Sequence, residues 1–216
     1  MRPLLAVLIL ISALSSTAGA NPYRDFDIHI ENVNVSKSID INARLYVPHK
    51  KNEHIVIFAP GTEGAVQPDF DENGNVDPLH ALSVQLANEN TVVIRYSTRG
   101  FTDPIKCLNR RHPSDNNYVK YCVDQEVRST VDFQSLDSDF QNVFRWTRKY
   151  AEKNNINDLT IVGVSEGMFH IARSAESVDL RGIPIIGIGA PLGSPYDVFK
   201  WQISSEYFFS KAEELL

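Results

Sequence analysis

The sequence predicts an α/β fold in which a mostly parallel sheet carries helices on both faces and follows an N-terminal antiparallel hairpin. Continuous apolar runs, which are typical of strands buried on both faces, occupy residues 55–59, 91–96, 159–164 and 183–190. Segments with the helical spacing of apolar residues lie between these runs. This alternation of strand and helix is the pattern of a parallel sheet.

The hairpin is predicted by two segments in which apolar and polar residues alternate, residues 26–30 and 39–47. A period of two places the apolar side chains on one face, so each segment is interpreted as a half-buried strand. A polar turn near Ser36 would join the two strands, and Pro48 would end the second.

Two helices are predicted between the parallel strands. Asp77 is expected to cap the first helix, with Pro78 at its first position, where the missing N–H costs nothing. The second helix is expected over residues 135–150, with a capping box formed by Ser138 and Gln141.

Residues 1–20 have the pattern of a signal peptide. Arg2 supplies the positive charge, residues 4–14 are apolar apart from Ser12, and residues 18–20 are small, as a cleavage site requires. We therefore expect a secreted or periplasmic protein whose mature chain, residues 21–216, is one domain with no membrane span. The acidic balance, a net charge of −6, gives no reason to expect nucleic acid or anionic membrane as a partner.

Cys107 and Cys122 are the only cysteines, and they bracket a polar loop. In an exported protein such a pair suggests a disulfide, which would staple the loop; two free thiols are the alternative. Their spacing fits neither a CxxC motif nor a Cys/His zinc site.

The strongest motif is the Gly-x-Ser-x-Gly sequence centred on Ser165. It follows the apolar run at 159–164 and precedes a helix-compatible stretch, residues 168–175. A strand, a sharp turn and a helix with a serine at the apex is the setting of a nucleophile elbow, in which Gly163 and Gly167 leave room for close contact of helix and strand. The alternative is an ordinary turn that happens to carry a serine.

Taken together, these features resemble the α/β-hydrolase superfamily over nearly all of the mature chain. Besides the serine motif, residues 60–64 resemble the family's His-Gly oxyanion loop, with proline in place of the histidine, and residues 96–101 are similar to its Asp-x-Arg-Gly turn. The resemblance implies that Thr62 and Glu166 donate backbone N–H groups to an oxyanion. It implies acyl transfer on a small-molecule or peptide ester or amide, by a Ser nucleophile with a histidine base and no cofactor.

The sequence departs from the family's order of serine, acid and histidine. His170 is the last histidine, and its place inside the helix after Ser165 carries its ring away from the serine hydroxyl. Two strands of the family's sheet would also lie beyond residue 190, and residues 198–216 look like the start of a lid. We expect an N-terminal portion of a longer hydrolase that turns over esters poorly by itself; the alternative is a non-catalytic relative that binds ligands.

Residues 69–77 match the first nine positions of an EF-hand calcium loop. Position 12 of that pattern should be glutamate and is His80. The favoured interpretation is a solvated acidic loop whose Asp77 caps the following helix, with no metal.

Overall fold

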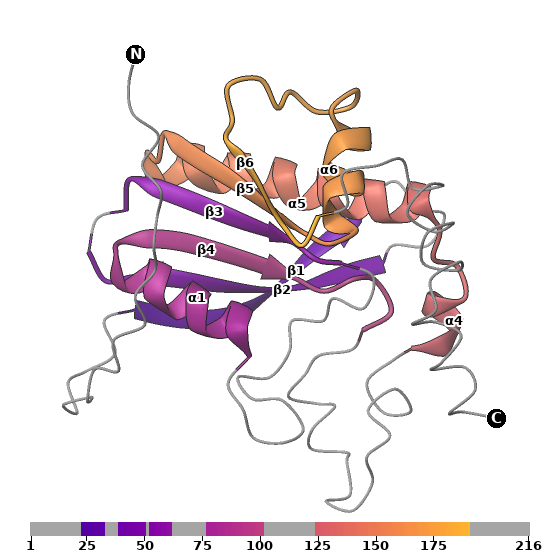
Figure 1. The fold of residues 1–216 in the computed structure, drawn as a ribbon. Coiled ribbons are helices and arrows are strands. Elements are labelled where there is room, and N and C mark those ends of the chain that lie inside the picture. Colours follow the sequence, from indigo (N-terminus) through magenta and orange to yellow (C-terminus); the bar gives the residue numbers. More distant parts are fainter. Residues whose placement is uncertain (1–22, 33–38, 51, 62–76, 102–123, 191–216) are drawn as a thin grey trace, which may run out of the picture.

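The computed structural model describes residues 23–32, 39–50, 52–61, 77–101 and 124–190 of the 216-residue chain. These ranges form a six-stranded sheet with helices on its two faces (Figure 1). The strands are β1 (Tyr23–Asn32), β2 (Ile39–Pro48), β3 (His54–Ala59), β4 (Thr91–Tyr96), β5 (Asp158–Val164) and β6 (Ile185–Ile188). The helices are α1 (Pro78–Asn88), α4 (Gln125–Arg128), α5 (Phe133–Asn154) and α6 (Gly167–Ser174).

The strand order is β1-β2-β4-β3-β5-β6. The pairs β1–β2 and β2–β4 are antiparallel, whereas β4, β3, β5 and β6 run parallel to one another. The predicted fold class is therefore confirmed: a mostly parallel sheet, helices on both faces and an N-terminal antiparallel hairpin.

The two faces of the sheet bury separate apolar clusters because successive side chains of a strand point in opposite directions. On β3, Ile55 and Ile57 belong to the larger cluster, which also contains Phe140 of α5 and Ile171 of α6. The alternate β3 residues, Val56 among them, lie in the smaller cluster that α1 covers. Helices α5 and α6 thus share one face of the sheet, and α1 lies on the other.

Helix α1 begins where the sequence predicts it. The carboxylate of Asp77 accepts hydrogen bonds from the backbone N–H groups of Leu79 and His80, at 3.1 and 3.2 Å. The same carboxylate accepts a 2.5 Å bond from the guanidinium of Arg95, which is 4% exposed on β4. Asp77 therefore caps the helix and also joins it to the sheet, and its carboxylate oxygens are occupied by hydrogen bonds from within the protein.

Helix α5 is longer than predicted, and its predicted cap is wrong. The capping box is formed by Asp132 and Ser135: the Asp132 carboxylate accepts from the Ser135 N–H, and the Ser135 hydroxyl accepts from the Asp132 N–H. The bond from the Ser135 backbone lowers the pKa of Asp132. Asn155 ends the helix in the left-handed conformation, with φ 54°, as a C-terminal cap.

Strand β6 also differs from its prediction. Residues 183–190 read as one buried strand, but the strand covers only Ile185–Ile188, and all four residues are exposed within the described part of the chain. Its apolar composition and its place at the end of the sheet are as expected; its burial is not.

Several predicted features lie outside the described residues. They are the signal peptide at 1–20, Thr62, residues 69–76 of the acidic loop, Cys107, Cys122 and the tail at 198–216. Among the helices that are described, none is both long enough and apolar enough to cross a bilayer.

Candidate active site

The serine of the Gly-x-Ser-x-Gly motif lies between the end of β5 at Val164 and the start of α6 at Gly167. Ser165 has φ 49°, a left-handed conformation that L-residues other than Asn and Asp rarely adopt, and its side chain is exposed. Strained backbone of this kind persists where the surroundings enforce it, and it concentrates at functional sites. The strand–turn–helix arrangement predicted for this motif is confirmed.

The two flanking glycines let α6 approach the sheet. A Cβ atom on Gly167 would overlap the carbonyl oxygen of Ala59 and would lie 2.7 Å from that of Pro60. A Cβ atom on Gly163 would lie 2.5 Å from Sδ of Met168 and 2.8 Å from Cδ1 of Ile171. Glycine at 167 is therefore required by backbone atoms of the β3 end, and glycine at 163 by side chains of α6.

The segment after β3 passes directly beside the serine. A Cβ atom on Gly61 would lie 3.1 Å from Cβ and 3.7 Å from Oγ of Ser165. The Pro60–Gly61 segment thus borders the Ser165 hydroxyl, which is where an oxyanion loop must run. Thr62, the expected donor, is the next residue and falls outside the described ranges.

Glu166 occupies the turn at the start of α6. Its backbone is helical, with φ −55° and ψ −24°, and its side chain caps nothing. The neighbouring Ser165 N–H donates to the carbonyl of Ile188 at 2.8 Å, which ties the elbow to β6. Within the described residues the Glu166 N–H makes no hydrogen bond, so it is available as a donor at the helix N-terminus.

Four histidine side chains are described, and none hydrogen-bonds to Ser165. His49 is exposed after β2. His54 lies at the N-terminal end of β3, whereas Ser165 follows the C-terminal end of the neighbouring strand β5; the His54 ring hydrogen-bonds to the Thr160 hydroxyl at 2.9 Å. His80 bonds to the Tyr46 hydroxyl at 3.0 Å, on the α1 face.

His170, the fourth, lies inside α6 and turns towards α5, where its Nδ1 is 2.8 Å from a carboxylate oxygen of Asp137. The ring is 6% exposed, and Asp137 also accepts a 2.6 Å bond from Nε of Arg173. His170 is thus committed to a helix–helix contact.

A second buried ionic group connects α5 to the turn after β4. Arg99 donates through Nε and Nη2 to the two oxygens of Asp139, at 2.8 and 2.5 Å, and both side chains are 1% exposed. Burial raises the pKa of Tyr96 well above its ordinary value, and the negative charges of Asp139 and Asp137 raise it further. The sequence analysis did not predict the ionic contacts of Asp137 or of Asp139. The sequence feature that could have indicated them is that both aspartates lie on the buried side of α5.

No family model and no curated protein sequence matches the chain. Among the described residues, no group of three or more His, Cys, Asp or Glu side chains could hold a metal ion.

Solved structures with a similar fold include a brefeldin A esterase, a bacterial homologue of human hormone-sensitive lipase. It is 13% identical, with a TM-score of 0.49, and the match covers 80% of this chain and 41% of that one. An alpha-beta serine hydrolase homologue from Coxiella burnetii is 15% identical, with a TM-score of 0.44 over 83% of this chain and 70% of the other. A thermostable carboxyl esterase from Bacillus coagulans is 14% identical, with a TM-score of 0.47, and the match covers 88% of this chain and 51% of the esterase.

The chain thus spans about half or less of the length of these two esterases, 41% and 51%. At 13–15% identity the likeness concerns the path of the backbone and carries no activity across. The strand order, the parallel β4-β3-β5-β6 block and the strained serine between β5 and α6 together make the fold α/β-hydrolase-like.

Proposed function

We propose that the chain belongs to a serine hydrolase that cleaves ester or amide bonds with Ser165 as its nucleophile. The observation that carries the proposal is the left-handed backbone of Ser165, which presents an exposed hydroxyl between a parallel strand and a helix N-terminus. An ordinary turn gives a serine no reason to adopt this conformation, because Asn or Gly would adopt it with less strain.

In the proposed reaction the Ser165 hydroxyl attacks the acyl carbonyl and loses its proton to a general base. The backbone N–H groups of Glu166 and Thr62 stabilise the oxyanion that forms, an effect worth about 3–4 kcal/mol per donor in comparable enzymes. The acyl C–O or C–N bond then breaks, and the alcohol or amine leaves with the proton that the base had taken, which leaves the acyl group on Ser165. Water attacks this acyl-serine, releases the carboxylic acid and restores the serine hydroxyl. The substrate is a small-molecule or peptide acyl compound, and no cofactor takes part.

The base in this proposal is none of His49, His54, His80 and His170. Hydrogen bonds hold His54, His80 and His170 elsewhere, and the exposed His49 makes no hydrogen bond to the serine. That observation is also what favours the second candidate, a non-catalytic α/β-hydrolase-like protein that binds ligands at the elbow. A serine without a neighbouring base is a poor nucleophile, so the two candidates differ in chemical reactivity.

A fluorophosphonate probe distinguishes them. In the native protein, isolated at the length at which cells produce it, we expect covalent labelling at Ser165, located by peptide mass spectrometry. Ser165→Ala should abolish the labelling, whereas Ser129→Ala, at an exposed serine beyond α4, should leave it unchanged. Labelling that persists in Ser165→Ala would refute the nucleophile, and a native protein inert to the probe would support the non-catalytic candidate.

We further propose that the protein is exported, to the periplasm or the medium, after removal of residues 1–20, and that Cys107 and Cys122 are bridged. The 15-residue separation of the two cysteines corresponds to about 3 kcal/mol of stabilisation in the chain-entropy model. Intact-mass measurement of the exported protein is expected to show no alkylation before reduction and two alkylated thiols after it. Two thiols that react without reduction would show that the cysteines are free.

A further inference from the structure

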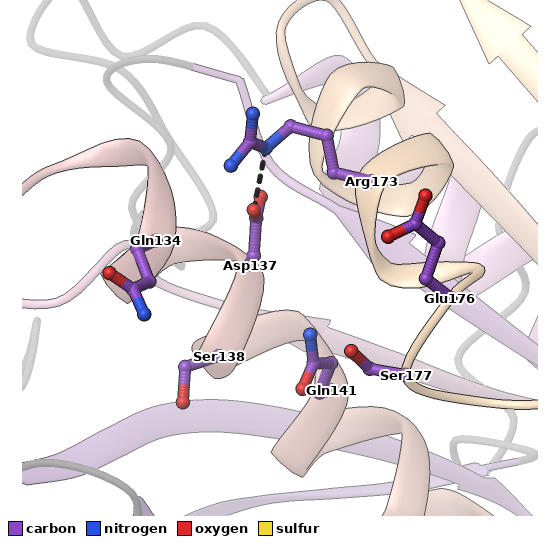
Figure 2. A pocket seen from close by; sticks show the side chains of 7 residues that line it. All are labelled: Gln134, Asp137, Ser138, Gln141, Arg173, Glu176 and Ser177. Carbon is purple, nitrogen blue, oxygen red and sulfur yellow. Dashed lines mark hydrogen bonds and ion pairs between the residues drawn. The ribbon is translucent and has the colours of Figure 1, made fainter.

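A polar hollow of about 470 Å³ lies between the first half of α5 and the end of α6, away from the serine elbow (Figure 2). One face of α5 supplies residues at positions three and four apart, and the other wall is the end of α6 with the turn that follows it. The lining side chains are Gln134, Asp137, Ser138, Gln141, Arg173, Glu176 and Ser177. None of these side chains is apolar, so the lining of the hollow favours a charged or strongly polar ligand.

Arg173 is held in one place at the rim of this hollow. Its Nε donates to Asp137 at 2.6 Å, and its guanidinium carbon lies 5.9 Å from the ring centre of Phe133. The two terminal nitrogens make no hydrogen bond within the described part of the chain, although the side chain is 52% exposed. A fixed guanidinium with free terminal N–H groups is a preorganised receptor for a carboxylate.

Glu176 brings an uncompensated negative charge to the same wall. Hydrogen bonds from Ala175, Ser177 and Val178 continue the helical turn past the end of α6, so residues 173 and 176 stay neighbours on one side, about 5–6 Å apart at Cβ. At that spacing they could pair, but Arg173 is turned to Asp137 and Glu176 has no partner among the described residues (Figure 2).

The distribution of charge selects the class of ligand. A simple anion at Arg173 would also meet the carboxylates of Asp137 and Glu176, and a simple cation at Glu176 would meet the guanidinium. A molecule that carries both charges would satisfy the open donors of Arg173 and the open acceptor of Glu176 together. Neutral hydrogen-bonding groups from Gln134 and Ser177 complete the lining.

We propose that this hollow is a binding site for a small zwitterion of the amino-acid type. Its carboxylate is bound by the terminal N–H groups of Arg173, and its ammonium by the carboxylate of Glu176. The site is independent of the chemistry at Ser165, so it stands or falls separately from the proposed hydrolase function.

Isothermal titration of the full chain with L-glutamine tests the proposal, with N-acetyl-L-glutamine, which lacks the ammonium, and L-glutaminamide, which lacks the carboxylate, as matched probes. We expect the zwitterion to bind with a Kd below about 1 mM and each matched probe to bind at least about tenfold more weakly. No detectable heat with L-glutamine at concentrations well above that Kd, or equal affinity for the three probes, would overturn the proposal.

Glu176→Gln and Arg173→Gln should each weaken L-glutamine binding at least about tenfold, the ratio expected for a lost charge-assisted hydrogen bond. Glu152→Gln and Arg148→Gln, exposed changes on α5 outside the hollow, should not alter it. Arg173→Gln also removes a partner of Asp137 and can disturb folding, but Glu176 makes no hydrogen bond or ion pair within the described structure, so the Glu176→Gln variant tests binding without removing such a contact. Unchanged affinity in Glu176→Gln would refute the assignment.

Discussion

Gly167→Ala is expected to destroy the serine elbow and to destabilise the protein by more than about 3 kcal/mol, the upper end of ordinary overpacking. The added methyl group would overlap the Ala59 carbonyl oxygen and would approach that of Pro60 to 2.7 Å. Both are backbone atoms at the end of β3, which pairs with β4 on one side and β5 on the other, so no rotamer change can relieve the overlap. Helix α6 would have to move away from the sheet, and Ser165 would move with it.

Gly163→Ala is the matched control, because its methyl group would meet the side chains of Met168 and Ile171, which can repack. We expect a cost of about 1–3 kcal/mol for this variant, and Met168→Ala in the same chain should recover part of it. Urea unfolding measures the difference in stability, and fluorophosphonate labelling reports the elbow. If Gly167→Ala were no more harmful than Gly163→Ala, the close contact of α6 with β3 would not be what the motif protects.

The fold was predictable because its signals are local. The apolar runs of β3, β4 and β5 need no knowledge of their neighbours to be interpreted as buried strands, and the Asp77-Pro78 pair marks a helix start by its own chemistry. The elbow is local as well, since strand, serine and helix follow one another within the sequence. Strand β6 was mispredicted as buried because burial depends on what lies beside a strand, which its own residues do not encode.

The N-terminal cap of α5 was mispredicted because two pairs of residues near the helix start have the spacing of a capping box. Ser138 and Gln141 have the spacing of a capping box, but Asp132 and Ser135 stand six residues earlier and form the capping box of the helix. The ionic contacts of Asp137 and Asp139 could not be predicted either, because their partners are 33 and 40 positions away in the sequence. Only the placement of α5 beside α6 and beside the turn after β4 brings these groups together.

The buried ion pair of Arg99 and Asp139 gives the second expected result: Asp139→Asn should lower the free energy of unfolding by about 3–5 kcal/mol. The side chains of Arg99 and Asp139 are each 1% exposed and are joined by two hydrogen bonds, of which the single amide oxygen of asparagine could accept one, so the guanidinium would stay charged in the interior without a counter-charge. The bond from Arg99 to the Ser135 carbonyl, at 2.8 Å, joins it to a neutral group and cannot offset that charge.

Asp179→Asn is the control, since it breaks an ion pair with Arg181 whose side chains are 63% and 91% exposed, and we expect little change there. Replacing both buried partners, as in Arg99→Met with Asp139→Leu, should cost less than Asp139→Asn alone, because no uncompensated charge is left inside. Urea unfolding measures the free energy of unfolding of all three variants, and an unchanged m-value shows that the differences are differences in stability. An Asp139→Asn protein as stable as the wild type would mean that water reaches Arg99 and solvates its charge, and the cost assigned to a buried unpaired charge would be refuted.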